Sequence, residues 1–127
     1  MSQGKRSGIV KVSLRQVNDG ISVIDLEGDF DLYSSPKARE ILLKLAKEKA
    51  PAVVVNLSKV GYMDSSGIAT LIEALRALGK YGGKLILAGV NLKTMEVIKL
   101  ARLEKIFDIK ENEEQALAST KSQTQQV

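Results

Sequence analysis

Apolar and polar residues alternate near the start of the chain. Residues 10–15 read Val-Lys-Val-Ser-Leu-Arg, and this period of two is typical of a strand with one exposed face. The segment 18–20, Asn-Asp-Gly, follows. It predicts a hairpin turn, because these residue types tolerate a positive φ. A second apolar run covers 21–26, and we expect Gly28 to close it. The first two strands are therefore predicted to be antiparallel neighbours.

Three longer segments place apolar residues at the spacing of an amphipathic helix. The first begins at Ser35, expected as the N-cap, with Pro36 at the first helical position, and Pro51 marks its end. The second covers 68–78, and Asn91 is the expected cap of the third. The apolar positions of the first two helices are Ala38, Ile41, Leu42, Leu45, Ala46, Ile68, Leu71, Ile72, Leu75 and Leu78.

Two continuous apolar runs, 52–57 and 85–88, show neither period. Such runs are typical of strands that are covered on both faces, as in parallel sheets. A short strand at 107–109 and a short helix opened by Asn112 complete the pattern. The order β-β-α-β-α-β-α-β-α contains βαβ crossovers. It predicts a single α/β domain with a mixed β-sheet, in which an N-terminal hairpin adjoins parallel strands and helices pack against the sheet.

The length of 127 residues fits one domain of ordinary size. Hydrophobic residues make up 44% of the chain and aromatic residues 4%, so the core is expected to be aliphatic. We expect a flexible N-terminus at 1–8, a folded domain at 9–118 and a polar, flexible tail at 119–127.

The chain contains no Cys and no His. This excludes disulfide scaffolds, thiol nucleophiles, Cys/His zinc sites and the usual general base near neutral pH. The acidic residues do not form a run such as D-x-D-x-D-G that would hold a hard cation. We therefore expect no catalytic residue, no metal ligand and no cofactor, and the chain is not expected to be an enzyme.

The net charge of +4 is small, and Lys and Arg residues are scattered along the chain. A nucleic-acid binder would gather them into a basic stripe with residues placed for stacking, so nucleic-acid binding is not expected.

No apolar run approaches the roughly 20 residues that span a bilayer, and no apolar segment follows the basic residues near the N-terminus. We expect a cytoplasmic protein without membrane association.

The segment 61–67, Gly-Tyr-Met-Asp-Ser-Ser-Gly, lies between a predicted buried strand and the second helix. Loops of this kind, beyond the carboxyl ends of parallel strands, commonly carry function. Capping by Asp64 or Ser65 is a sufficient structural reason for one of these residues, with a contribution of about 1 kcal/mol. Capping explains neither two adjacent hydroxyls nor the apolar pair Tyr62 and Met63 at an expected surface.

A phosphate on a serine of this turn would change binding more than stability. A helix N-terminus favours negative charge by at most about 2 kcal/mol, and Asp64 would oppose this term, so the fold would hardly change. A partner that covered the turn would have to desolvate the phosphate against Asp64, at a cost of several kcal/mol. The turn is therefore predicted to be a docking site that phosphorylation controls.

The segment 56–67, Asn-Leu-Ser-Lys-Val-Gly-Tyr-Met-Asp-Ser-Ser-Gly, resembles the signature of the bacterial anti-sigma factor antagonists, the small STAS-domain proteins. The resemblance covers roughly residues 9–118. Gly28 and Asp31 are similar to the family's earlier Gly-x-x-Asp, while 29–30 and 32–35 depart from the family pattern. The resemblance implies a STAS-like α/β fold.

The resemblance also implies a mechanism. Ser65 would be the phosphorylation site, and the partner would be an anti-sigma factor that is a serine kinase and binds ATP and Mg²⁺ on its own chain. The unphosphorylated form would bind this kinase and release the sigma factor. Phosphorylation would end binding until a separate serine phosphatase removed the phosphate and restored the unphosphorylated form. A monomer is expected. The partner-binding residues would be Asp31, Tyr62, Met63, Asp64, Ser65, Ser66 and Gly67.

Three alternatives to this hypothesis remain open from the sequence. A STAS-type module could bind a small anion or nucleotide at the same helix N-terminus, although no G-x-x-x-x-G-K-[ST] motif is present. A scaffold module could share the domain without regulating a sigma factor. A serine hydrolase with Ser65 as nucleophile would need a Ser–Lys pair, and no Ser-x-x-Lys begins at Ser65.

Overall fold

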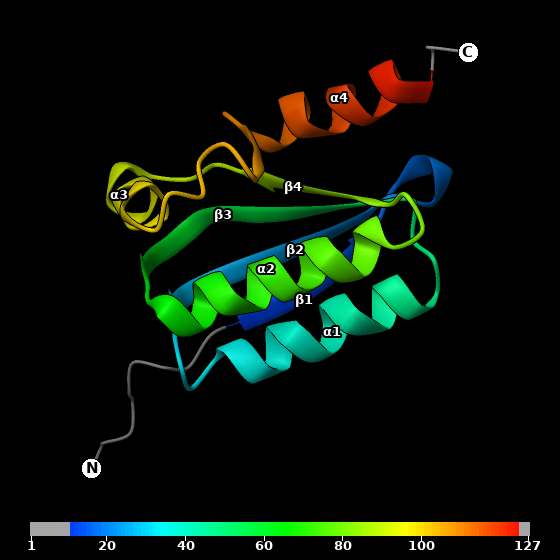
Figure 1. Cartoon of the computed structure of the whole chain (residues 1–127). Coiled ribbons are helices and arrows are strands. Elements are labelled where there is room, and N and C mark those ends of the chain that lie inside the picture. Colours follow the sequence, from blue (N-terminus) through cyan, green and yellow to red (C-terminus); the bar gives the residue numbers. More distant parts are fainter. Residues whose placement is uncertain (1–10, 125–127) are drawn as a thin grey trace.

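The computed structural model describes residues 11–124 (Figure 1). Within this range five strands and four α-helices alternate in the order predicted from the sequence. The elements are β1 (Lys11–Gln16), β2 (Ser22–Phe30), α1 (Ser35–Lys47), β3 (Ala52–Met63), α2 (Ser65–Gly79), β4 (Lys84–Ala88), α3 (Leu92–Leu100), β5 (Asp108–Lys110) and α4 (Glu113–Thr124). The expected flexible N-terminus at 1–8 lies outside the described residues.

The strands form one mixed sheet in the order β1-β2-β3-β4-β5. β1 and β2 are antiparallel, and β2, β3, β4 and β5 are parallel neighbours. Helices α1 and α2 lie side by side on one face of the sheet, and α4 lies on the other (Figure 1). The predicted fold class, an N-terminal hairpin joined to parallel strands with helices packed against the sheet, is confirmed.

The core is aliphatic, as the composition predicted. The larger cluster joins the inner face of the sheet to α1 and α2, with Leu42, Leu71 and Leu78 fully buried. A smaller cluster on the opposite face contains sheet residues and a single buried residue of α4, Ala116. Because α4 buries so little apolar surface, the first face supplies most of the hydrophobic stabilisation.

The hairpin turn lies where the sequence predicted it, between β1 and β2. Asp19 and Gly20 adopt φ angles of 67° and 76°, and the turn forms a short 3₁₀ segment, η2 (Asn18–Gly20). The expectation that Gly28 closes the second strand is wrong. β2 continues to Phe30, because Gly28 takes a φ of 111° that lets the strand bend and resume pairing with β3 after a shift of register.

β3 is also longer than the sequence pattern indicated. The expected loop from residue 58 continues as strand to Met63, and its last residues pair with the end of β2, including Phe30 with Met63. The reason is tertiary: β2 supplies hydrogen-bond partners that the local sequence does not reveal. The turn before α2 is thereby reduced to Asp64.

The helix boundaries refine the predicted caps. The N-cap of α1 is Ser34 and not Ser35, so the prediction of Ser35 as the cap is wrong. Asn91 caps α3 as predicted, with its side-chain oxygen 2.7 Å from the Thr94 N–H nitrogen. Helix α4 runs to Thr124, well into the segment expected as a polar tail, and residues 125–127 lie outside the described range.

No helix in the described part of the chain has both the length and the apolar character needed to span a bilayer.

Candidate functional site

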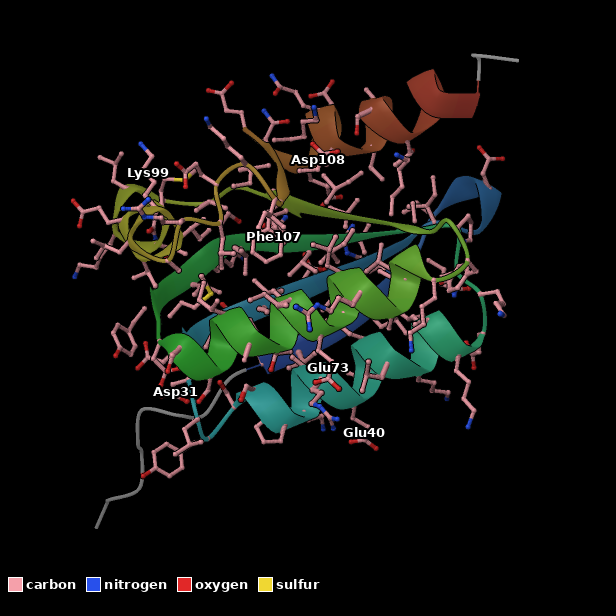
Figure 2. All side chains as sticks on the ribbon, in the orientation of Figure 1. Asp31, Glu40, Glu73, Lys99, Phe107 and Asp108 are labelled. Carbon is pink, nitrogen blue, oxygen red and sulfur yellow. The ribbon has the colours of Figure 1, made fainter. Side chains whose placement is uncertain are left out.

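Two parallel strands end side by side at the candidate site. Phe30 at the end of β2 pairs with Met63 at the end of β3. The next residues in the chain, Asp31 and Asp64, therefore leave the sheet at the same edge. Figure 2 shows Asp31 at this end of the molecule, beside the start of α2. The structure thus brings together two segments that are about thirty residues apart in the sequence.

Asp64 caps α2. Its Oδ1 accepts hydrogen bonds from the backbone N–H groups of Ser66 at 2.8 Å and Gly67 at 3.2 Å. These donors have no partner within the helix, so an Asp here satisfies the first turn and complements the helix dipole. Its Oδ2 accepts from the Leu32 N–H at 3.3 Å. One carboxylate therefore joins the helix start to the loop that follows β2.

Asp31 organises that loop. Its Oδ1 accepts from the Tyr33 N–H at 3.0 Å and the Ser34 N–H at 3.2 Å, and the side chain is 8% exposed. The Ser34 hydroxyl donates to the Asp29 carbonyl at 2.7 Å and accepts from the Asp31 N–H at 2.9 Å. Because these polar groups satisfy one another, Asp31 holds the loop in shape while its own carboxylate is mostly covered.

Gly67 allows close packing of α2 against both strand ends. A Cβ atom at this position would lie 2.7 Å from the Phe30 carbonyl oxygen and 2.8 Å from Met63 Cγ. Only glycine fits this approach without displacing the backbone. The glycine at the end of the Asp-Ser-Ser-Gly motif thus determines how closely the first turn of α2, which carries Ser65 and Ser66, packs against the ends of β2 and β3.

The two serines differ in exposure. Ser65, the first residue of α2, is exposed, and Ser66 is partly covered. Tyr62 is half exposed beside them, at 50%. The expectation that Met63 lies on the surface is wrong, since its side chain is 1% exposed and belongs to the core. The continuation of β3 explains this, because it turns Met63 inward beneath Gly67.

Two exposed residues of the site were not among the predicted partner-binding residues. Leu32 is 62% exposed and Tyr33 is 79% exposed, in the loop that Asp31 and Asp64 hold. A signal was present in the sequence, because an aliphatic and an aromatic residue stood together in a segment expected to be a loop. Their exposure depends on the loop geometry, which the sequence pattern alone does not supply.

The chemistry of this arrangement favours modification and docking over catalysis. A nucleophilic serine requires an adjacent base, but Asp31 and Asp64 are occupied with backbone N–H groups, and the sequence holds no His. Within residues 11–124, no group of three or more acidic side chains is gathered in a way that could hold a metal ion. An exposed hydroxyl at a helix N-terminus is instead a position where an added phosphate is electrostatically tolerated.

Comparison with known families identifies one match over most of the chain. Residues 14–116 match the model of the STAS domain. An anti-sigma-B factor antagonist of Bacillus subtilis (strain 168) is 31% identical over 100 residues, which cover 79% of this chain and 90% of that protein. A protein of the same description from Staphylococcus epidermidis is 28% identical over 97 residues, covering 76% of this chain and 90% of that protein.

Solved structures share the fold. The crystal structure of an anti-sigma factor antagonist from Mycobacterium paratuberculosis superposes with a TM-score of 0.81 at 24% identity, covering 90% of this chain and 96% of that one. The unphosphorylated form of the anti-sigma factor antagonist SpoIIAA gives 0.77 at 22% identity, with 88% and 97% covered. The phosphorylated form of Bacillus SpoIIAA gives 0.70 at 22% identity, with 87% and 99% covered. At these identities the superpositions establish the fold.

Proposed function

The chain belongs to the STAS domain family, and we propose that it acts as an anti-sigma factor antagonist that is switched by phosphorylation of Ser65. In its unphosphorylated form it binds an anti-sigma factor and thereby releases the sigma factor. Phosphorylation of Ser65 ends this binding. The observation that carries the proposal is the position of Ser65, which is exposed at the first residue of α2, directly after the cap Asp64 that also bonds the loop after β2.

The geometry supports Ser65 over Ser66 as the acceptor. Ser65 is open to an approaching kinase, whereas Ser66 is partly covered and its N–H is held by Asp64. The dipole of α2 favours a negative charge at this end of the helix. The Asp64 cap and the close packing at Gly67 hold the backbone of the turn that presents Ser65.

The switch acts through the interface. Phosphorylation adds about −1.5 to −2 charges. A partner that covers Leu32, Tyr33 and Tyr62 would bury this charge beside the carboxylate of Asp64, which is unfavourable. Since each 1.4 kcal/mol changes affinity tenfold, a penalty of a few kcal/mol is sufficient to dissociate the complex.

The proposed partner is an anti-sigma factor that is itself the serine kinase and carries ATP and Mg²⁺ on its own chain. A separate serine phosphatase returns the chain to its binding form. The chain contributes the acceptor hydroxyl and the docking surface and performs no catalysis of its own. We place this exchange in the cytoplasm, with the chain acting as a monomer over a domain at residues 9–118.

The proposal is tested by incubating the purified chain with each anti-sigma factor kinase of its source bacterium, ATP and Mg²⁺, and mapping the phosphate by mass spectrometry. We expect incorporation at Ser65, no incorporation in Ser65→Ala, and normal incorporation in the neighbouring control Ser66→Ala. In binding assays we expect Ser65→Ala to retain the partner and Ser65→Asp to lose it. Phosphate on another residue, with Ser65→Ala still a full substrate, would refute the assignment.

A further inference from the structure

The end of the molecule opposite Ser65 carries a hollow between two helices. Helices α1 and α2 lie side by side, run in the same direction and end at the same end of the molecule (Figure 1). Between their last turns lies an open hollow of about 310 Å³, whose apolar lining comes from Leu43, Ala46 and Ala77. Ser65 begins α2 and the hollow adjoins its end. The 15 residues of the helix therefore separate the two by about 20 Å.

Tyr81 is the aromatic residue that lines this hollow. Its hydroxyl donates to the Ala50 carbonyl at 2.7 Å, and the side chain is partly buried. The Lys49 ammonium lies 5.0 Å from the centre of the Tyr81 ring, a distance at which the ring attracts a cation. The ring is thus held at its hydroxyl and contacted on its face. A side chain entering the hollow would meet an aromatic surface arranged before binding, which lowers the entropic cost of association.

The backbone conformation of Lys49 is unusual for a lysine. Lys49 follows the C-cap of α1 with a φ of 64°, in the left-handed region that favours glycine. A glycine would end the helix here with less strain, but it would place no charge over Tyr81. Strained residues of this kind are concentrated at sites that bind or react. The position of Lys49 is therefore an observation, separate from the hollow itself, that indicates a binding role.

Positive charge is gathered around the hollow and has no acidic partner. Residues 44–49 and 76–84 contain six basic residues and one acidic residue, Glu48. The basic residues are Lys44, Lys47, Lys49, Arg76, Lys80 and Lys84. Among the described residues none of the six forms an ion pair with a carboxylate, whereas Arg39, earlier on α1, pairs with Glu73 at 2.7 Å. The charge along the helix pair is thus neutralised in one part and uncompensated around the hollow.

The helix dipole accounts for only part of this charge. Cations are favoured in the last turn of a helix, and α1 and α2 both end here. This effect does not extend to Lys84, which begins β4. It also explains neither the apolar hollow nor the placement of Lys49 over Tyr81. A surface that only balanced the dipole would need no such lining.

The shape of this surface favours a protein segment over a membrane. Surfaces that bind a bilayer insert protruding apolar side chains. Within residues 11–124, the large exposed apolar side chains all lie outside 43–49 and 76–84. A hollow instead receives an apolar side chain, and cations around it are complementary to carboxylates on either side of that side chain.

From these observations we propose that this hollow is a docking site for an acidic segment of a partner protein, in which an apolar side chain stands between carboxylates. The apolar side chain enters against Leu43 and Tyr81, and the carboxylates face Lys47, Lys49 and Lys80. We call these five residues the basic hollow. The inference goes beyond the proposed function, because it assigns a second interaction surface to the chain.

Docking at the basic hollow is independent of the phosphorylation state. A phosphate on Ser65 would lie about 20 Å away along α2. Charges are largely screened beyond about 8 Å at physiological ionic strength. The chain can therefore hold an acidic partner at one end while the serine turn at the other end binds or releases the anti-sigma factor.

The test begins with a phage-displayed library of random peptides, selected on the immobilised full chain. We expect the enriched peptides to share an apolar residue flanked by Asp or Glu. Binding of the tightest such peptide should shift backbone amide resonances within 43–49 and 77–81 of the isotope-labelled chain. Its affinity should fall as the salt concentration rises. It should agree within about twofold between the wild type and Ser65→Asp.

Charge variants test whether the basic hollow holds the peptide. We expect Lys47→Glu/Lys80→Glu to weaken binding about tenfold or more, since like charges would then face each other. Lys37→Glu/Lys105→Glu is the control, because it changes the net charge equally at two exposed positions outside the hollow. It should reduce the affinity far less. Lys47→Gln/Lys80→Gln, which introduces no repulsion, should give a smaller loss than the glutamate pair, and circular dichroism confirms that each variant is folded.

The contrary outcomes are equally specific. Selection that yields no acidic peptides, or acidic peptides that bind Lys47→Glu/Lys80→Glu as tightly as the wild type, would refute the docking site. Binding to phosphatidylglycerol vesicles that this variant loses, in the absence of any acidic peptide ligand, would overturn it in favour of a membrane. Weakening by Ser65→Asp would refute its independence from the switch. None of these measurements uses the anti-sigma factor, so the proposed function and this inference can fail separately.

Discussion

The carboxylate of Asp64 accepts a hydrogen bond from the backbone N–H of Leu32 at 3.3 Å while its other oxygen caps α2. The loop after β2 and the start of α2 are therefore held by one side chain. Leu32 and Ser65 lie on these two segments and share this support. A partner that recognises both meets a surface arranged before binding, which lowers the entropic cost of association.

Replacement of Asp64 should reduce stability and loosen the site together. For Asp64→Ala we expect a loss of about 1–2 kcal/mol in the free energy of unfolding, since the cap bonds to Ser66 and Gly67 disappear. Asp64→Asn should lose less, because an amide oxygen can still cap the helix. Urea denaturation followed by circular dichroism measures both. Equal stability of the alanine variant and the wild type would show that the cap does not contribute.

The close approach at Gly67 gives a second prediction with a built-in control. Gly67→Ala would place a Cβ 2.7 Å from the Phe30 carbonyl oxygen. We expect it to cost about 1–3 kcal/mol through displacement of α2. Gly79→Ala, near the other end of the same helix, meets nothing within 4 Å. It should be neutral or stabilising by up to about 1 kcal/mol, as alanine favours helix over glycine. Thermal melts of the pair decide the point, and a similar melting temperature for both variants would contradict it.

The sequence was sufficient for the order of elements and for the cap at Asn91, and it limited the cap of α2 to Asp64 or Ser65. Apolar spacing and capping chemistry act within a few residues, so a local pattern reveals them. The pairing of β3 beyond residue 58 was missed, because its partner on β2 lies about thirty residues away. The same long-range pairing decides that Met63 is buried. Local sequence does not contain this information.

The candidate site was likewise predictable where it depends on local sequence and was missed where it depends on long-range contacts. The Asp-Ser-Ser-Gly turn and its position before a helix were predictable, because an N-cap has a recognisable composition. Leu32 and Tyr33 were not assigned to the site, since their exposure depends on a loop held from two directions by Asp31 and Asp64. Surfaces assembled from several loops become visible only when the strand order is known.

An ion-pair cluster fastens α4 to the sheet. Arg15 on β1 donates to Asp25 at 2.6 Å and to Glu113, the first residue of α4, at 2.7 Å. The Asn56 side-chain amide also donates to Glu113, at 3.0 Å. The hydrogen bond from Arg15 is the main cause that lowers the pKa of Glu113 below its ordinary value of 4.5, and partial burial opposes it. Because α4 buries little apolar surface, this cluster is a substantial part of its attachment.

The lowered pKa of Glu113 sets the pH range in which the cluster stabilises the fold. A carboxyl group with a lower pKa in the folded state adds stability above its unfolded pKa, here about 4.5, and loses it as the pH falls through the folded pKa. We therefore expect the melting temperature of Glu113→Gln to lie below that of the wild type at pH 7. The difference should shrink as the pH falls below about 4.5.

Glu114→Gln is the matched control for this series, since Glu114 is the exposed neighbour of Glu113 and its replacement changes the net charge equally. We expect its melting temperature at pH 7 to equal that of the wild type. Differential scanning calorimetry from pH 7 to pH 3 measures all three proteins. If Glu113→Gln keeps the same deficit at every pH, the ion pair with Arg15 is not its cause.

Phosphorylation of Ser65 should leave the fold almost unchanged. Ser65 is exposed at the first residue of α2, where the helix dipole favours a negative charge by about 0.3–1 kcal/mol and the adjacent Asp64 opposes it. We expect the free energies of unfolding of the wild type, Ser65→Asp and the phosphorylated chain to agree within about 1 kcal/mol. Denaturant titration tests stability, and binding to the anti-sigma factor is measured on the same samples. A large loss of stability on phosphorylation would contradict a switch that acts at the interface. Dissociation of the partner would then follow from unfolding of α2.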